Sequence, residues 1–433
     1  MKRIYLNRFL LAGLASWVIS GPVIAADPNF EEIDVDVLYS LYEENPGDVL
    51  GYVADPIGDI NNDGAPDFVT SAPYQVNSGN VTGKAYVFSG ATGDLLNSIE
   101  GNPGEFMGFS ATLAGDVNND GVNDYILGSR TRAIVVSGSD HSLLHEWVMP
   151  GIGFGFDSNT AGDLNDDGFD DVIVGAPYAA DNGPASGKMY AFSGQDGSVL
   201  WSFSGEAGWN VGLGLGPVDD VNADGTPDVV VAAPNGSDNH KGIAFVLSGL
   251  DGSVLMELEP KTPSVGQNGT NTFGVFHIHG AGDTDNDGIG DIYVGDYNSK
   301  GGQHNANGTN SAGSGRGRAF IFSGADGSLI WRIEGDAFGD GMGPGRGVED
   351  INGDGHDDIF VAAWAYGQGA TDFDVGKGYL VSGADGSVIR TMTGAVPFGY
   401  IGVDAAALGD VNEDGLTDYI LTGWGSVHVI LGN

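Results

Sequence analysis

Acidic and amide side chains recur in one nine-residue pattern that the chain of 433 residues repeats seven times. Each copy carries Asp at positions 1, 5 and 9, Asn or Asp at position 3, and Gly at position 6. Successive copies begin 57, 47, 57, 63, 67 and 60 residues apart. With position 7 included, the candidate metal ligands are Asp59, Asn61, Asp63, Ala65, Asp67; Asp116, Asn118, Asp120, Val122, Asp124; Asp163, Asn165, Asp167, Phe169, Asp171; Asp220, Asn222, Asp224, Thr226, Asp228; Asp283, Asp285, Asp287, Ile289, Asp291; Asp350, Asn352, Asp354, His356, Asp358; and Asp410, Asn412, Asp414, Leu416, Asp418.

This order of oxygen donors suits Ca²⁺, a hard cation that takes six to eight oxygen ligands at about 2.3–2.6 Å. Side chains at positions 1, 3 and 5 point inward as the loop curls, and Gly at position 6 allows the tight turn. Position 7 offers its backbone carbonyl, so its side chain is free to vary from Ala65 to His356. Asp at position 9 closes the shell as a bidentate ligand. The sequence therefore predicts up to seven bound Ca²⁺ ions.

The alternative is that the Asp-Gly and Asn-Asp pairs are ordinary hairpin turns. A turn does not require an acid three residues after its Gly, so seven complete copies favour a metal loop. The first half of the pattern matches an EF-hand, but the closing acid comes at position 9 rather than 12. Runs such as Phe68-Val69-Thr70 follow, and these are typical of strands rather than helices.

The repeats predict an all-β fold, a seven-bladed β-propeller of four-stranded antiparallel blades. Each unit is interpreted as strand, calcium loop, strand, connection, strand, Asp-Gly turn and strand; Gly83 to Gly90 and Gly187 to Gly194 are examples of the third strand. Residues 26–433 form one domain, with blades at about 46–102, 103–149, 150–206, 207–260, 261–335, 336–394 and 395–433 plus 35–43.

The two ends of the repeat region predict how the ring closes. The last unit ends at Asn433, after its third strand, whereas the segment from Val37 to Gly47 is similar to the end of the first unit, Leu95 to Gly104. We therefore expect the N-terminal strand to complete blade 7 beside Val427 to Leu431, which leaves no open edge in the ring.

This layout resembles the FG-GAP repeat β-propeller at the head of integrin α subunits, over about residues 35–433. Its motifs are Phe273-Gly274 and Phe398-Gly399, placed on first strands, and Gly175-Ala176-Pro177 and Ser71-Ala72-Pro73 after second strands. In that family Ca²⁺ loops lie on one face of the disc, and partner recognition tends to use the other face. Here all seven blades carry the motif, whereas integrin heads carry it on a subset.

Residues 1–25 have the pattern of a secretory signal peptide, with Lys2, Arg3 and Arg8 before the apolar run from Phe9 to Ile19. The alternative, a membrane anchor, would need a longer apolar run. Cleavage after Ala25 or Ala26 would leave an exported chain that is secreted, on the cell surface or in the periplasm. No later segment is expected to cross a membrane. The chain has no Cys, which excludes disulfides and thiolate metal sites, and its net charge of −43 argues against nucleic acid as a partner.

The longer connections between second and third strands lie, by strand parity, on the face opposite the calcium loops. They bring aromatic and His side chains toward that face, and the candidate ligand contacts are Tyr178, His304, Trp364, Tyr366 and Trp424. No catalytic residues and no cofactor other than Ca²⁺ are indicated. The preferred interpretation is an adhesion or recognition module for an extracellular protein or glycan; the alternatives are a carbohydrate-active enzyme and a structural surface or matrix protein.

Overall fold

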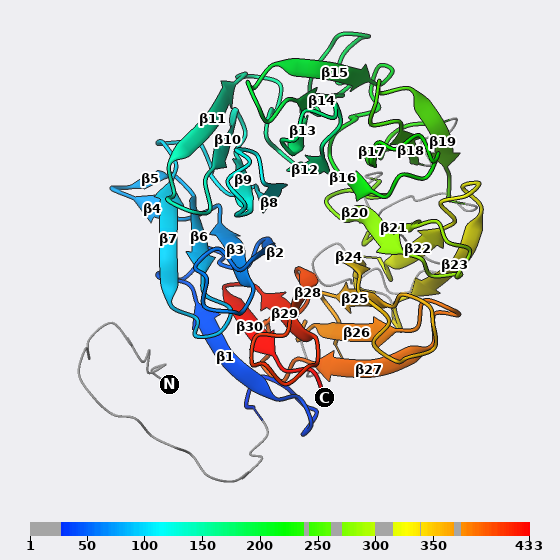
Figure 1. The fold of residues 1–433 in the computed structure, drawn as a ribbon. Helices are drawn as coiled ribbons and strands as arrows, with labels where there is room; N and C mark the ends of the chain where they lie inside the picture. Colours follow the sequence, from blue (N-terminus) through cyan, green and yellow to red (C-terminus); the bar gives the residue numbers. More distant parts are fainter. Residues whose placement is uncertain (1–26, 238–241, 261–270, 299–314, 338, 368–373) are drawn as a thin grey trace, which may run out of the picture.

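The computed structural model describes residues 27–237, 242–260, 271–298, 315–337, 339–367 and 374–433. Within these residues every regular element is a β-strand, and the strands form seven four-stranded antiparallel sheets arranged in a ring (Figure 1). The predicted seven-bladed propeller is confirmed. Each sheet lies within one of the repeat spans given above. The predicted signal segment, residues 1–25, and His304 lie outside the described residues.

The blades share one order, from an inner first strand to an outer fourth strand. Blades 1 to 3 consist of β2 (Ala54–Gly58), β3 (Asp67–Ala72), β6 (Lys84–Phe88) and β7 (Leu95–Glu100); β8 (Ser110–Gly115), β9 (Asp124–Gly128), β10 (Arg132–Val136) and β11 (Leu143–Val148); and β12 (Ser158–Gly162), β13 (Asp171–Gly175), β14 (Lys188–Phe192) and β15 (Val199–Ser204). Blades 4 and 5 consist of β16 (Leu215–Val218), β17 (Asp228–Ala233), β18 (Ile243–Leu247) and β19 (Val254–Leu258); and β20 (Ile278–Gly282), β21 (Asp291–Asp296), β22 (Arg318–Phe322) and β23 (Leu329–Glu334). Blades 6 and 7 consist of β24 (Met342–Gly347), β25 (Ile359–Ala363), β26 (Lys377–Val381) and β27 (Val388–Thr393); and β28 (Ala405–Gly409), β29 (Asp418–Gly423), β30 (Ser426–Ile430) and β1 (Val37–Tyr42). A small hairpin, β4 (Val76–Asn77) and β5 (Asn80–Val81), extends blade 1.

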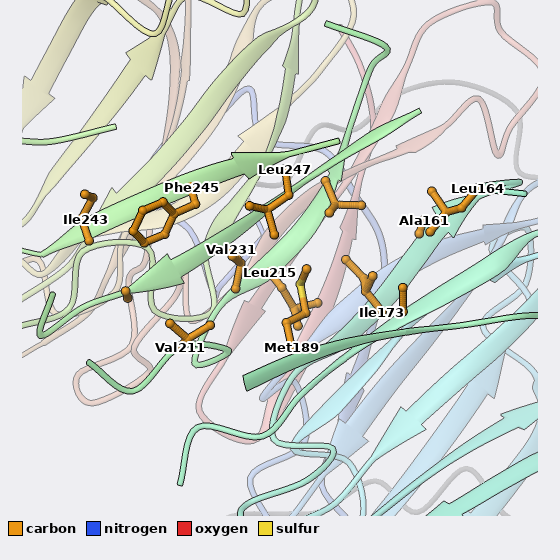
Figure 2. Close-up of a cluster of buried hydrophobic side chains, with 13 residues drawn as sticks. Ala161, Leu164, Ile173, Met189, Val211, Leu215, Val231, Ile243, Phe245 and Leu247 are labelled. Atoms are coloured by element: carbon orange, nitrogen blue, oxygen red, sulfur yellow. The ribbon is translucent and has the colours of Figure 1, made fainter. Parts of the chain in front are cut away.

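The apolar cores lie between neighbouring blades rather than within one sheet. Second strands such as β17 are buried along their whole length, because each face is covered by another blade. Successive side chains point to opposite faces of a strand. Val229 and Val231 therefore pack with Ile173 of blade 3, whereas Val230 packs with Ile292 of blade 5. Figure 2 shows the first of these cores.

Polar contacts at the outer strands also join the blades. The indole nitrogens of Trp147 and Trp201 donate to the carbonyl oxygens of Gly197 and Gly249 in the next blade, at 2.9 and 2.7 Å. The indole nitrogen of Trp331 donates to Gly383 in the same way. These outer-strand tryptophans therefore have a structural role at the blade boundaries.

The ring closes as expected, with β1 as the outer strand of blade 7. Its register pairs Tyr39 with Val429 and Leu41 with Val427. The Tyr39 hydroxyl lies 2.9 and 2.7 Å from the carbonyl oxygens of Ser89 and Gly90 in blade 1. The N-terminal strand therefore links blade 7 both to its own sheet and to the first blade.

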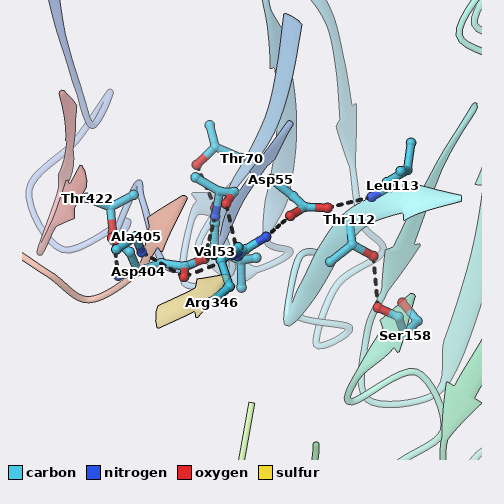
Figure 3. Close-up of polar contacts among 11 residues, drawn as sticks. Val53, Asp55, Thr70, Thr112, Leu113, Ser158, Arg346, Asp404, Ala405 and Thr422 are labelled. Carbon is cyan, nitrogen blue, oxygen red and sulfur yellow. Dashed lines mark hydrogen bonds and ion pairs between the residues drawn. The ribbon is translucent and has the colours of Figure 1, made fainter. Parts of the chain in front are cut away.

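Carboxylates connect the inner strands, whose free edges face the axis of the ring. Asp404 accepts a hydrogen bond from the Ala54 amide of the next blade at 3.0 Å, and Asp55 accepts one from Leu113 at 2.8 Å. Arg346 of β24 forms ion pairs with both Asp55 and Asp404 (Figure 3). Edge amides of the inner strands are thus satisfied by side chains of the preceding blade.

One detail of the sequence interpretation is wrong. Phe273-Gly274 and Phe398-Gly399 do not lie on first strands but in the connections before β20 and β28. Gly274 has φ of +72° and Phe398 has φ of +60°. This left-handed conformation is incompatible with an extended strand, so these residues turn the chain into the blade instead.

Candidate metal-binding loops

The seven nine-residue loops all join a first strand to a second strand, so they lie on one face of the ring. In blade 1 the loop follows β2 directly and ends with Asp67, the first residue of β3. Blades 2, 3, 5 and 7 repeat this placement. In blade 4 one residue, Asp219, separates β16 from the loop, and in blade 6 the loop begins three residues after Gly347 and Asp358 immediately precedes β25. The fold therefore places the loop at the same end of all seven blades.

Each loop contains two left-handed residues, at positions 4 and 6. Gly at position 6 has φ between +85° and +96° in all seven loops. Position 4 has φ between +55° and +75°, and its residues are Asn62, Asn119, Asp166, Ala223, Asn286, Gly353 and Glu413. Sequence reasoning missed position 4, although Asn, Asp or Gly in five of the seven copies is a signal for this conformation.

Asp at position 1 holds the curl of the loop. One of its carboxylate oxygens accepts the amide of position 5 at 2.9–3.1 Å, and the other accepts the amide of Gly at position 6 at 2.7–2.9 Å. Asp at position 5 in turn accepts the amide of position 7 at 2.9–3.0 Å. The loop folds around its own carboxylates.

Asp at position 9 is fully buried in every blade. One oxygen accepts the amide of position 2 at 2.8–3.1 Å, and the other accepts the amide of the Gly after the third strand at 2.7–3.2 Å. This residue therefore connects the loop to the third strand, a structural role that the sequence did not indicate.

Burial controls the ionisation of these position-9 carboxylates. It raises the pKa to about 6 for Asp67 and Asp228 and to about 7 for Asp124 and Asp171, against the hydrogen bonds that lower it. Among the described residues, none of the seven forms an ion pair with Lys or Arg. Their negative charge thus has backbone amides but no basic side chain as a partner.

Two features of the loops bear on the predicted cation. The Oδ1 atom of Asn118, at position 3 of the second loop, is buried and has no hydrogen-bond donor in the described structure. Carboxylate oxygens of Asp283, Asp285 and Asp287 lie within 4.8 Å of one another in the fifth loop. Oxygen donors without protons, gathered at this spacing, match what Ca²⁺ requires.

The predicted ligand contacts on the opposite face fall into separate groups. Trp364 lies 5.6 Å from the ring of Tyr400, which lies 6.1 Å from Trp424. Trp424 is 47% exposed, and Tyr178 is 49% exposed beside Phe156 of blade 3. Tyr366 is 7% exposed and lies under the Lys377 ammonium, so its ring is part of a core.

Sequence reasoning missed the aromatic residues around the axis on this same face. Phe109 contacts Tyr52 and Phe156, with ring centroids 5.6 and 5.0 Å apart. Phe276 of blade 5 contacts the same two rings at 6.2 and 5.5 Å. These four rings come from first-strand connections of four blades, and they meet only because the ring closes.

The loop face has a different character at the axis. A cavity of about 580 Å³ opens there between the inner strands of blades 1, 5, 6 and 7. Its walls include Gly58, Gly282, Gly347 and Gly409, and its polar groups include Glu349. Acidic and small residues therefore line the axis on the loop face, whereas aromatic residues surround it on the opposite face.

These features are those of an FG-GAP repeat, integrin α-like β-propeller. The family model described as "FG-GAP repeat" matches residues 156–190, which cover blade 3 from its entry to its third strand and include one complete loop. Integrin alpha pat-2 of Caenorhabditis elegans is 27% identical over 298 residues, and integrin alpha pat-2 of Caenorhabditis briggsae matches equally well. The match covers 68% of this chain but only 21% of either relative, so the chain spans about a fifth of their length. Among the described residues there is no apolar helix of membrane-spanning length.

Proposed function

We propose that the protein is an exported, calcium-loaded propeller that recognises an extracellular protein or glycan ligand. The observation that carries the calcium part is the fifth loop, in which three carboxylates converge without a basic partner among the described residues. In every loop the ion would be held by the side chains at positions 1, 3, 5 and 9 and the carbonyl of position 7. It would cancel the repulsion among these carboxylates, so its role is structural.

Calcium binding is tested by calorimetric titration of chelator-treated protein, together with thermal unfolding. We expect up to seven ions and a higher Tm with calcium, because a ligand that binds only the folded state stabilises it by about 1.4 kcal/mol at ten times its Kd. Magnesium at the same concentration serves as a control, since it demands a smaller octahedral shell. Unchanged unfolding with and without calcium, and no heat of binding, would refute this part.

The recognition part rests on the face opposite the loops. Trp364, Tyr400 and Trp424 form an aromatic cluster there, in which Trp424 is exposed and the other two rings are partly buried. Exposed aromatic side chains are enriched where proteins meet ligands. The similarity to integrin α supports a surface that binds a ligand, and it supports a location outside the cytoplasm.

An array of glycans and matrix proteins, probed with calcium and with chelator, tests this assignment. We expect binding that the substitution Trp424→Ala reduces at least tenfold, because aromatic anchors dominate binding energy. Tyr42→Ala is the matched control, since Tyr42 is 58% exposed on the outer strand of the same blade. Equal loss in both variants, or no ligand for protein shown to be folded, would contradict the recognition face.

A further inference from the structure

The calcium loops are not equivalent in how they touch their neighbours. The residue at position 8 of each loop lies against the residue that precedes the loop of the preceding blade, which is Gly in five blades, Asp219 in blade 4 and Glu349 in blade 6. These residues are Pro66, Asn123, Asp170, Pro227, Gly290, Asp357 and Thr417. Two of the seven are Asp, and both belong to junctions with an additional set of hydrogen bonds.

At the junction of blades 2 and 3, Asp170 both accepts a hydrogen bond from Asp116 and donates one to it. The Asp116 amide donates to Asp170 Oδ2 at 2.8 Å, and the Asp170 amide donates to the Asp116 carbonyl at 3.2 Å. A Cβ on Gly115 would lie 2.3 Å from Asp170 Oδ2, so the contact needs a glycine at that position.

The junction of blades 5 and 6 repeats this arrangement. The Asp283 amide donates to Asp357 Oδ2 at 2.9 Å, and the Asp357 amide donates to the Asp283 carbonyl at 3.1 Å. His356 adds a contact, with Nδ1 2.7 Å from the Thr284 carbonyl oxygen. Among the described residues, the other five junctions lack this reciprocal pair, and at two of them Pro66 and Pro227 have no amide hydrogen to give.

The bonded groups are parts of the expected ligand shells. Asp116 is the position-1 ligand of the second loop. The Asp170 amide belongs to the same peptide group as the Phe169 carbonyl, the position-7 ligand of the third loop. A cation on that carbonyl polarises the peptide and strengthens its N–H as a donor. The third loop therefore helps to fix the backbone of a ligand in the second.

We propose that Asp170 and Asp357 are positioning residues that couple calcium binding within two pairs of loops, the second with the third and the fifth with the sixth. This inference rests on the proposed calcium binding. Filling either loop of a pair raises the affinity of the other, and by linkage the factor is the same in both directions. Neighbouring loops that meet through Pro66 or Pro227 bind calcium independently of each other.

The test is a set of calorimetric calcium titrations on the full chain. Asp167→Ala disables the third loop, and Asp224→Ala disables the fourth, which meets the third through Pro227. We expect Asp167→Ala to remove one ion and to weaken a second about fivefold. We expect Asp224→Ala to remove one ion and leave the other affinities unchanged. Asp120→Ala, in the second loop, gives the reciprocal measurement.

Asp170→Pro supplies the decoupled background. Loops 1 and 4 already carry proline at this position, so the substitution is compatible with the loop backbone, and circular dichroism checks the fold. In this background Asp167→Ala is expected to remove one ion only. If the wild type binds calcium but Asp167→Ala and Asp224→Ala act alike, the coupling is wrong and calcium binding stands. If the wild type binds no calcium, both proposals fail.

Discussion

Arg346 of blade 6 forms an ion pair with Asp55 of blade 1, across the inner strand of blade 7. The same guanidinium reaches Asp404 of blade 7 at 3.3 Å. Burial lowers the pKa of Arg346, but the two carboxylates more than offset this and hold it above its ordinary value. Arg346 therefore joins three blades at the axis of the ring. β1, in contrast, closes the ring only at its outer edge.

Replacing Arg346 by Met should lower the free energy of unfolding by about 3 kcal/mol, because it leaves two buried carboxylates without their cation. Urea unfolding at fixed calcium concentration measures the effect. Arg332→Met is the control, since the Arg332–Glu334 pair has side chains that are 39% and 34% exposed. That variant should lose less than about 1 kcal/mol. Similar losses in the two variants would contradict the role given to Arg346.

Asp171 and Asp167 should respond differently to calcium, although both are expected ligands of the third loop. Asp171 accepts the amides of Leu164 and Gly194 at 2.8 Å each. Asp171→Ala leaves both donors unsatisfied and should cost about 3 kcal/mol even in chelator. Asp167 is partly exposed, so Asp167→Ala should cost little in chelator and more with calcium. Thermal unfolding of both variants, in chelator and in calcium, gives the comparison. A loss of stability that depends on calcium in Asp171→Ala but not in Asp167→Ala would contradict this prediction.

The fold was predictable because the loop imposes the same chemistry at the same place in every blade. Asp at positions 1, 5 and 9 and Gly at position 6 leave a pattern within nine residues, and its repetition marks the blades. The ring closure was predictable for the same reason, since the segment around Tyr39 retains the sequence of a fourth strand. Local chemistry that repeats is visible in one sequence.

Contacts between distant segments left no such pattern. Arg346 and Asp55 are 291 residues apart, and neither belongs to a motif. Tyr400 joins Trp364 to Trp424 only through the packing of blades 6 and 7. Position 9 of the loop illustrates the same limit. Its Asp could be recognised in the sequence, but the hydrogen bond that this Asp accepts from the Gly after the third strand forms only in the folded sheet.

The fifth loop offers a prediction whose sign depends on calcium. Burial and the neighbouring Asp287 and Asp283 raise the pKa of Asp285, which is the extra acid of this loop. Asp285→Asn gives the loop the side chains of its neighbours and removes like-charge repulsion. We expect it to stabilise the protein slightly in chelator, by a few tenths of a kcal/mol, and to weaken calcium binding at this loop about tenfold. Calorimetry measures calcium binding, and thermal unfolding measures stability in chelator and in calcium. A change in stability of the same sign in both buffers would contradict the assignment.

His428 provides a pH-dependent contribution at the closure of the ring. Its Nδ1 lies 2.8 Å from the Ser40 hydroxyl of β1, and its Nε2 lies 3.0 Å from that of Ser426. Phe30 and Tyr42 cover the ring edge to face. Burial lowers the pKa of His428 to about 4, although the Asp27 carboxylate acts in the opposite direction.

Because the unfolded chain protonates His428 near pH 6.5 and the folded chain only near pH 4, stability should fall as the pH is lowered through this window. One proton difference corresponds to about 1.4 kcal/mol per pH unit. His428→Gln removes this term, so its free energy of unfolding should depend less steeply on pH than that of the wild type between about pH 6.5 and 4. Urea unfolding at half-unit pH steps measures both slopes at fixed calcium, and carboxylates that titrate in the same range affect both proteins alike. Parallel slopes would show that His428 is not held neutral at the junction of β1 and β30.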